Sequence, residues 1–552
     1  MTGRTMVATR GREPSSRRST AVSPYDGTGC GHRFLKLVLQ FTFRASAAKF
    51  STKMAVVGHG RRLHYKDLRR EALALAARLR EAGVEPGDRV AMLLPNSVAA
   101  AVSVWAILET RCVLVPLHAA ARAPALAAVL RDAAPRWVIT SGELSQSFST
   151  VRETLPDLHG LIVWDSRQSE EAIIPWTLDT IGESPQLQID PQENDDCRRP
   201  PCDDELAALI YTSGSTGEPK GVMLTHANMI AALTAVNAYL ELGPDDVLFS
   251  ALPLSSSYGL YQLISALWIG GTIVLDRSFA FPARSLQLAA EERATVFAGV
   301  PTMYAWMATV AALPKCDLSG LRTLTSAAAS LPVEHASRVR ERLPQARLFV
   351  MYGQTECKRI SFLPPEDLDR KPGSVGRGMP FQEHRIVDET GCPVSAGGIG
   401  ELVVRGPHVM KGYWRKPDAT AQTLRPLPGS NVPWLHTDDL FQVDDEGYLY
   451  FVGRRDDLLK IGGHKVSPRE IEEVLCQLDG VREAAVVGID DSNWGCAAKA
   501  FLVIDDGHEI NEDAVVRHCS QRLQGFKVPK SVAFVRELPK TESGKVRKLD
   551  LK

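Results

Sequence analysis

The sequence has no apolar run long enough to cross a membrane, and it has almost no net charge. A membrane-spanning helix needs about 20 apolar residues, and the best candidate, Ala101–Leu117, is interrupted by Glu109 and Arg111. The 64 Lys and Arg residues nearly balance the 65 Asp and Glu residues, which leaves a formal net charge of −1. These absences predict no transmembrane segment, and they argue against nucleic acid or an anionic membrane as a partner.

The cysteines lack the spacing of metal ligands. All ten are scattered along the 552 residues, without the short repeated intervals that are typical of zinc sites. Disulfides belong mainly to secreted proteins, whereas thiols inside cells stay reduced. We therefore expect ten reduced cysteines in a cytoplasmic protein.

Residues 1–32 differ in composition from the rest of the chain. They contain many Arg, Ser and Gly residues and only two acids, Glu13 and Asp26. This composition is similar to that of an organellar transit peptide. The segment has no amphipathic apolar pattern, however, so a disordered N-terminal extension is the favoured interpretation and organellar targeting is the alternative.

From residue 33 onward the chain has the patterning of a globular protein. Helical spacing of apolar residues alternates with short apolar runs, and strands that alternate with helices favour a parallel sheet with crossover helices. The predicted helices are His64–Arg80, Ala99–Leu108 and Pro124–Asp132, and the predicted strands between and after them are Asp88–Leu94, Cys112–Val115 and Trp137–Thr140. The sequence therefore predicts an α/β fold.

The stretch Tyr211–His226, which reads YTSGSTGEPKGVMLTH, carries the strongest local signal. The apolar run Glu205–Ile210 predicts a buried strand before it, and Val222–Leu240 predicts the start of a helix after it. Two glycines let the backbone bend, so that N–H groups and hydroxyls can surround an anion, and a lysine adds positive charge. The residues of this predicted polyphosphate site are Thr212, Ser213, Gly214, Ser215, Thr216, Gly217 and Lys220.

Two other interpretations of this stretch are weaker. A flexible Gly/Ser linker does not explain the lysine or the apolar run that follows. The common nucleotide P-loop needs G-x-x-x-x-G-K-[ST], but here Gly214 and Gly217 are too close together and Lys220 is followed by Gly221. The sequence therefore predicts a phosphate loop of another kind.

The stretch resembles the phosphate-loop signature of the adenylate-forming superfamily. This superfamily includes acyl-CoA synthetases, acyl-AMP ligases, peptide-synthetase adenylation domains and luciferases. Further motifs of the superfamily follow in order between Phe34 and Lys552. The resemblance implies a large α/β N-terminal domain with the adenylate-forming enzyme fold over residues 33–455, and a small, mobile α+β C-terminal domain over residues 456–552.

A second motif, Met351–Glu356, follows the predicted strand Leu348–Val350. By the resemblance, Tyr352 lies against the adenine of ATP, Gly353 belongs to the same nucleotide site and Thr355 contacts the α-phosphate. Glu356 is implied to ligate Mg²⁺, and a hard carboxylate oxygen suits that cation.

The ribose site is implied by His436–Asp439 and by Arg454. In this resemblance Asp439 holds both ribose hydroxyls, and Arg454 also contacts the ribose. Asp438 stands where the superfamily usually has glycine. If that position uses a positive φ, aspartate tolerates it better than most residues do.

The C-terminal region resembles the mobile domain of the superfamily. By the resemblance the domain rotates about Asp456, and Gly462, Gly463 and His464 line the tunnel of the thiol acceptor. Lys545 is implied to enter the active site during adenylation. From the residues themselves, Ser467–Glu470 predicts a helix-capping box with proline at the first helical position.

The predicted acyl pocket includes Ser256, Ser257 and Tyr258, which follow the predicted strand Val247–Leu252. Many acyl-CoA synthetases have histidine at the position of Ser256, and peptide-synthetase domains have aspartate near Ser257. Neither is present, and a buried ammonium without a carboxylate is costly. This corner therefore argues against an α-amino acid substrate, although three serines are also typical of a simple turn.

The predicted activity is AMP-forming acyl-CoA ligation, which the resemblance connects with fatty acid metabolism. A small-molecule carboxylic acid would react with MgATP to give acyl-AMP and pyrophosphate, and CoA would then take the acyl group. The implied catalytic residues are Lys545, Lys220, Glu356 and Thr355, and the implied cofactors are ATP, Mg²⁺ and CoA or carrier-protein pantetheine. The alternatives are an acyl-AMP ligase or stand-alone adenylation enzyme that loads a carrier protein, and a nucleotide-binding regulator without catalysis.

Overall fold

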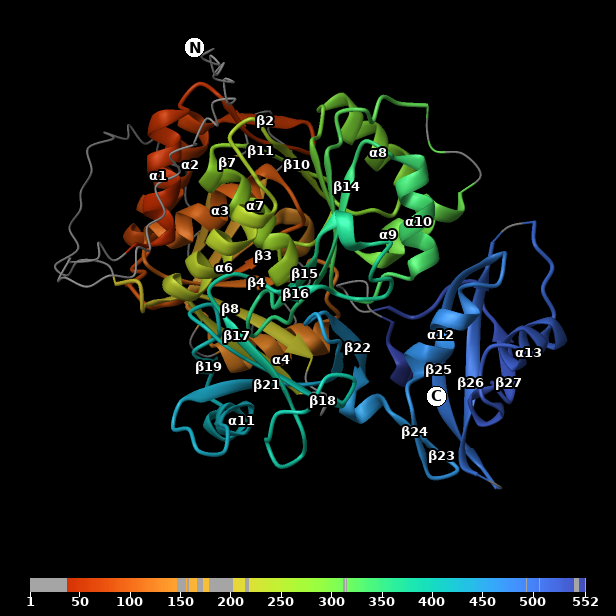
Figure 1. Cartoon of the computed structure of the whole chain (residues 1–552). Coiled ribbons are helices and arrows are strands. Elements are labelled where there is room, and N and C mark those ends of the chain that lie inside the picture. The colour runs from red at the N-terminus through yellow and green to blue at the C-terminus, as the bar shows by residue number, and fades with distance from the viewer. Residues whose placement is uncertain are drawn as a thin grey trace, which may run out of the picture. The chain divides into compact units, whose positions relative to one another are not determined.

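Parallel strands with helices between them form most of the two largest sheets among the described residues, as the periodicity predicts (Figure 1). The computed structural model describes residues 37–145, 155, 158–165, 172–177, 202–213, 218–310, 313, 315–492, 494–505, 507–540 and 546–551. The N-terminal segment 1–32, the loop residues 214–217 and Lys545 lie outside these described residues.

One large sheet carries the strands that lead to the predicted acyl corner and to the Met351–Glu356 motif. Among the described residues it has nine strands, and those from β14 to β1 run parallel. In spatial order they are β16 (Arg377–Gly378), β15 (Ser361–Leu363), β14 (Arg347–Tyr352), β13 (Thr323–Ser326), β12 (Val296–Gly299), β10 (Val247–Ser250), β11 (Thr272–Leu275), β1 (Met54–Gly58) and β2 (Arg61–His64). The segments that follow β10, β13 and β14 leave at the same edge, where open α/β sheets bind ligands.

A second sheet, of eight strands among the described residues, carries the predicted phosphate loop. Its middle strands are parallel, and its spatial order is β19 (Gly412–Tyr413), β9 (Pro219–Thr225), β8 (Leu206–Ser213), β4 (Val113–Leu117), β3 (Arg89–Leu93), β5 (Trp137–Ser141), β6 (Gly160–Asp165) and β7 (Ala172–Thr177). The predicted strands of this region are confirmed, with boundaries that move by up to three residues.

The other described strands form three smaller sheets. The first is antiparallel and consists of β17 (Glu383–Val387), β18 (Ile399–Arg405), β21 (Pro433–Val443), β20 (Leu424–Pro426) and β22 (Leu449–Arg454). The second pairs β23 (Leu459–Ile461) with β24 (His464–Val466), and the third contains β25 (Val481–Asp491), β26 (Gly495–Ile504) and β27 (Ser531–Phe534).

The helices pack against the sheets, and helices and strands both contribute large buried side chains. α2 packs against α1 and α3, where the ring of Phe43 stacks on buried Trp105 with a centroid distance of 4.4 Å. The helices are α1 (Leu39–Lys49), α2 (Tyr65–Glu81), α3 (Val98–Glu109), α4 (Ala123–Ala133), α6 (His226–Tyr239), α7 (Ser257–Ile269), α8 (Pro282–Glu291), α9 (Pro301–Thr309), α10 (Val333–Arg342), α11 (Pro417–Thr423), α12 (Pro468–Leu475) and α13 (Glu512–Ser520).

None of the helices that the structure describes has the length and apolarity that crossing a membrane requires. The free thiols among the described residues include Cys112, Cys316, Cys357, Cys392, Cys476 and Cys519, as the sequence predicts for those positions.

Two local predictions are wrong. The chain after the phosphate loop forms strand β9 first, because Pro219–Thr225 pairs antiparallel with β8, and helix α6 begins only at His226. Thr225 and Asn228 form a capping box there, a signal that the sequence contains. The capping box expected at Ser467 is absent, because its hydroxyl donates instead to the carbonyl of Val452.

Candidate active site

The strands on either side of the predicted phosphate loop pair with each other. Strands β8 and β9 pair antiparallel, with Thr212 opposite Lys220 and Ser213 opposite Pro219. This pairing brings the two ends of loop residues 214–217 together and places the Lys220 backbone at its mouth. Gly221 is required one residue later, since a Cβ atom there would lie 2.9 Å from the ring of Tyr211.

Lys220, Tyr413 and Glu356 form one polar group beside this hairpin. Strand β19 pairs with β9, so that Tyr413 lies opposite Val222. The Lys220 Nζ atom lies 5.3 Å from the centroid of the Tyr413 ring, within cation–π range. The Tyr413 hydroxyl donates to Glu356 Oε1 at 2.9 Å. One tyrosine therefore contacts both the predicted phosphate-binding lysine and the predicted Mg²⁺ ligand.

The Asp439 carboxylate is held by three donors at the end of strand β14. Tyr352 Oη donates to Asp439 Oδ2 at 2.5 Å, and Gln354 Nε2 donates to the same oxygen at 2.9 Å. Arg454 Nε, from strand β22, donates to Oδ1 at 3.2 Å. Burial, followed by the charge of Asp439, raises the pKa of Tyr352 well above its ordinary value, so this hydroxyl keeps its proton and donates.

The turn before Asp439 uses the left-handed backbone region that the unusual aspartate suggested. Asp438 has φ of +56°, which confirms that a positive φ is needed where glycine is usual. Its N–H donates to Glu401 Oε1 at 3.1 Å. The buried Glu401 also lies 3.1 Å from His436 Nδ1 and accepts from Arg455 Nη2 at 3.3 Å. Sequence reasoning did not find Glu401.

The predicted acyl corner begins helix α7. Ser256 is the N-cap, and its Oγ accepts from the Gly259 N–H at 3.0 Å and donates to the Pro253 carbonyl at 2.8 Å. Tyr258 is buried and its hydroxyl lies 2.7 Å from Thr325 Oγ1. The Ser256 hydroxyl is therefore committed to the helix cap, whereas Ser257 contributes its carbonyl to a neighbouring loop.

That neighbouring loop contains Lys358 and Arg359, which sequence reasoning also missed. Lys358 Nζ donates to the Ser257 carbonyl at 3.2 Å. Burial, followed by the charge of Arg359, lowers the pKa of Lys358 well below its ordinary value. Both residues come shortly after Thr355 and Glu356 in the chain, with Cys357 between, so the loop after β14 connects the nucleotide motif with the acyl corner.

The predicted thiol loop joins β23 to β24. Gly462 and Gly463 have φ of +54° and +85°, values that favour glycine. The His464 ring stacks on Phe526 with a centroid distance of 4.5 Å. Asp456 lies in the short helical turn η2 (Arg455–Asp457), but its side chain, like that of Ser213, is outside the described part of the structure.

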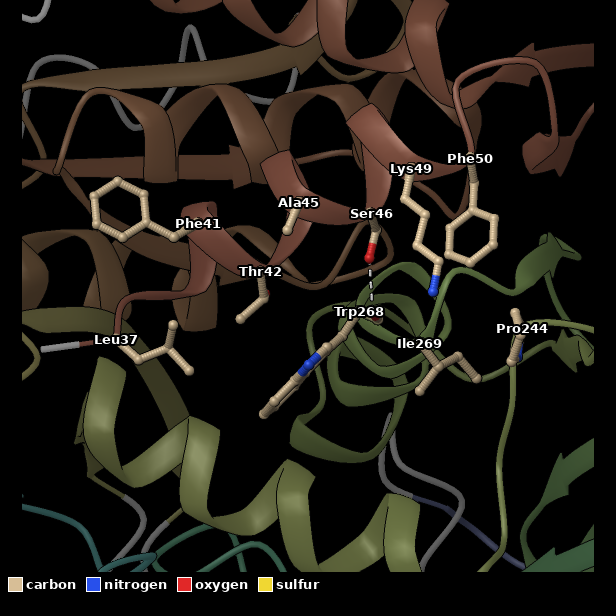
Figure 2. A pocket seen from close by; sticks show the side chains of 10 residues that line it. All are labelled: Leu37, Phe41, Thr42, Ala45, Ser46, Lys49, Phe50, Pro244, Trp268 and Ile269. Carbon is tan, nitrogen blue, oxygen red and sulfur yellow. Dashed lines mark hydrogen bonds between the residues drawn. The ribbon is translucent and has the colours of Figure 1, made fainter. Parts of the chain in front are cut away.

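A cavity of about 390 Å³ lies elsewhere, between helix α1, Pro244 and the end of helix α7 (Figure 2). Most of its lining is apolar, and Ser46 Oγ donates to the Trp268 carbonyl at 2.7 Å within it. None of the predicted site residues lines this cavity. Among the described residues, no group of three or more His, Cys, Asp or Glu side chains could hold a metal ion, so a cation at Glu356 would need other ligands.

Comparisons with known proteins cover nearly the whole chain. The model of the family described as "AMP-binding enzyme" matches residues 43–414, and that of the "AMP-binding enzyme C-terminal domain" matches residues 470–545. A feruloyl-CoA synthase from Amycolatopsis sp is 35% identical over 505 residues, which are 91% of this chain and 96% of that protein. A long-chain-fatty-acid–CoA ligase from Bacillus subtilis (strain 168) is 32% identical over 529 residues, with 92% and 93% covered.

The solved structures agree with these sequence matches. The crystal structure of ATP-bound MatB from Rhodopseudomonas palustris has a TM-score of 0.79 and 30% identity to this chain, and the match covers 93% of this chain and 98% of that one.

Proposed function

This chain belongs to the AMP-binding enzyme family and is an acid–thiol ligase of the acyl-CoA synthetase type, and from that premise we propose how its residues divide the reaction. A carboxylate oxygen attacks the α-phosphorus of ATP, the bond to pyrophosphate breaks, and acyl-AMP forms. The sulfur of CoA then attacks the acyl carbon, AMP leaves, and the thiol proton is released. No covalent bond to the protein is needed.

The ribose site is the part of the proposal that the geometry supports best. Asp439 is buried and fixed by Tyr352, Gln354 and Arg454. An ionised carboxylate has about four acceptor sites. The three donors occupy three of them, so one ribose hydroxyl can donate to Oδ1 and the second would replace one of the present donors. We assign Asp439 and Arg454 to the ribose, and Tyr352 and Gly353 to the adenine side. This convergence of three donors on one carboxylate is the observation that carries the assignment.

The phosphate site combines Lys220, Glu356 and Thr355. Lys220 supplies positive charge at the mouth of the hairpin, and Thr355 lies on the loop between Tyr352 and Glu356. The Glu356 carboxylate is a hard ligand, and Mg²⁺ commonly takes only one or two protein carboxylates and completes its shell with phosphates and water. The single carboxylate therefore fits Mg²⁺ that is bound together with ATP, and the cation there would neutralise phosphate charge.

The rest of the proposal concerns residues that the structure does not describe. The hydroxyls and N–H groups of Ser213, Gly214, Ser215, Thr216 and Gly217 would surround the phosphates. Lys545 would bridge the carboxylate and the α-phosphate during adenylation. The two family-model matches, at 43–414 and 470–545, support a division into a large and a small domain. We place the boundary between 33–455 and 456–552, and the small domain would turn about Asp456.

The thiol step is assigned to the loop with Gly462, Gly463 and His464. CoA is the proposed acceptor, since the curated relatives above are named for CoA products. Loading of a carrier-protein pantetheine stays the alternative, and a cytoplasmic location stays a prediction.

The test is product formation from MgATP and a panel of carboxylic acids, with and without CoA, measured by mass spectrometry. We expect acyl-CoA and AMP to form, in amounts that depend on which carboxylic acid is supplied. Asp439→Asn should raise the KM for ATP, whereas Asp445→Asn, at an exposed carboxylate after β21, serves as the matched control. Acyl-AMP that accumulates and ignores CoA would contradict the assigned acceptor, and an unchanged KM in Asp439→Asn would contradict the ribose site.

A further inference from the structure

The loop after β14 places an acidic side chain, Glu356, beside Tyr413 and a basic side chain, Lys358, beside the start of helix α7. It folds back on itself, because the Ile360 N–H donates to the Tyr352 carbonyl at 2.9 Å. A Cβ atom at Gly353 would lie 2.4 Å from the Lys358 carbonyl, so the two arms of the loop touch. Glu356 points from this loop to Tyr413, whereas Lys358 contacts the start of helix α7. The nucleotide site and the acyl corner are therefore adjacent.

Lys358 and Arg359 are both buried at that corner. Their exposed fractions are 5% and 3%. The Arg359 Cζ atom lies 5.2 Å from the centroid of the Tyr258 ring, and the Lys358 Nζ atom lies 5.0 Å from the same centroid and 4.4 Å from that of Tyr261. Both basic side chains thus lie over the face of a tyrosine that the acyl pocket is expected to contain.

The Arg359 guanidinium has no counter-charge among the residues that the structure describes. Neither Arg359 nor Lys358 forms an ion pair there, and the Arg359 Nε atom is buried without a hydrogen-bond partner. The buried Asp246, by contrast, is paired with Arg322 at 2.5 Å. A guanidinium does not lose its proton in proteins, and a buried charge is costly unless it is paired. Contacts with aromatic faces offset only part of that cost.

We propose that Lys358 and Arg359 form a subsite for a second carboxylate, and that the preferred substrate is a dicarboxylic acid. One carboxylate reacts with ATP beside Thr355 and Lys220, while the other stays ionised and accepts hydrogen bonds from Arg359 and Lys358. The second group takes part in no bond change. This inference rests on the proposed function, because it needs the acid to enter at the corner of Ser256, Ser257 and Tyr258.

The wild-type protein gives the first test. kcat/KM is measured for straight-chain dicarboxylic acids of increasing length and for monocarboxylic acids of the same carbon number, by pyrophosphate release in the presence of CoA. We expect the kcat/KM of a dicarboxylic acid of one length to exceed that of its monocarboxylic counterpart by about 10- to 100-fold. Hydrogen bonds to charged groups stabilise a complex by an amount that corresponds to this factor.

The Arg359→Met variant gives the second test. It removes the charge and keeps a long side chain over Tyr258, and it should lower kcat/KM for the dicarboxylic acid about 10- to 100-fold more than for the monocarboxylic acid. Arg347→Met is the matched control, since the exposed Arg347 also lies over an aromatic ring, that of Phe349, but outside the site. Arg359→Lys keeps the charge and should recover part of the preference.

Three outcomes would overturn the inference. If monocarboxylic acids are better substrates at every length, the second carboxylate has no subsite, although the ligase function stands. If Arg359→Met lowers activity equally for both kinds of acid, the pair acts on the reacting carboxylate or on folding. If no acid gives acyl-AMP or acyl-CoA, the proposed function fails and the inference fails with it.

Discussion

Tyr413 gives the sharpest test of the catalytic group, because one side chain contacts two of its members. The Tyr413→Phe variant removes the hydroxyl that donates to Glu356 Oε1 at 2.9 Å, and it keeps the ring below Lys220 at 5.3 Å. The variant therefore separates the support of the carboxylate from the support of the lysine. Tyr413 itself is buried, so a volume-conserving change is needed.

The expected loss follows from the hydrogen bond. A hydrogen bond to a charged group contributes about 1.5–3 kcal/mol, which corresponds to roughly 10- to 100-fold in rate at 1.4 kcal/mol per factor of ten. Glu356 is only half-buried, and water can replace the lost donor in part. We therefore expect a decrease of about 10-fold in kcat/KM for adenylation, near the lower limit of that range.

The assay is ATP–pyrophosphate exchange at several Mg²⁺ concentrations. Tyr413→Phe should need more Mg²⁺ for half-maximal exchange, because its Glu356 carboxylate is less well positioned. Tyr413→Leu, which also removes the ring below Lys220, should in addition raise the KM for ATP. Equal activity of the wild type and both variants would refute the reasoning, and so would a loss in Tyr413→Phe that does not depend on Mg²⁺.

Three further predictions concern the nucleotide turn, the C-terminal lysine and stability. Asp438 has φ of +56°, so Asp438→Gly should keep the free energy of unfolding within about 1 kcal/mol, whereas Asp438→Val should lower it by about 2 kcal/mol in urea titrations. Lys545→Ala should lose about 3–4 kcal/mol of transition-state stabilisation, roughly 10²- to 10³-fold in adenylation rate, and near-normal pyrophosphate exchange would exclude its role. Burial lowers the pKa of His226 from 6.5 to about 4. The unfolded chain binds a proton at this residue below pH 6.5, whereas the folded chain binds it only near pH 4. As the pH is lowered from 6.5 to 4, the free energy of unfolding should therefore decrease by up to about 3 kcal/mol. A His226→Asn variant with an unchanged pH slope would contradict this.

Much of the fold was predictable because its signals are local. The alternation of helices and strands depends on apolar spacing within a few residues of chain, and the strands near Asp88–Leu94 and Trp137–Thr140 were found in that way. The left-handed turn at Asp438 was also predictable, because the backbone at one residue determines which side chains it tolerates.

The two wrong local predictions concern short segments whose hydrogen bonds can be made in two different ways. Val222–Thr225 has an apolar pattern that fits either a strand or the start of a helix, and only pairing with β8 selects the strand. Ser467 has the composition of a capping residue, but the carbonyl of Val452 lies within reach of its hydroxyl and takes its hydrogen bond. In both cases a contact from outside the segment decides between two local choices.

The sequence by itself determined the class of fold, the order of the motifs and the residue types at the nucleotide site, because each of these depends on neighbours along the chain. Only the tertiary structure brought Tyr413 between Lys220 and Glu356, and Arg359 over the ring of Tyr258. These residues lie far apart in the chain, and they meet because strands from distant segments pair and leave the sheet at one edge. Burial, and the lack of a counter-charge among the described residues, are properties of that assembled neighbourhood, and no pattern within a single segment could reveal them.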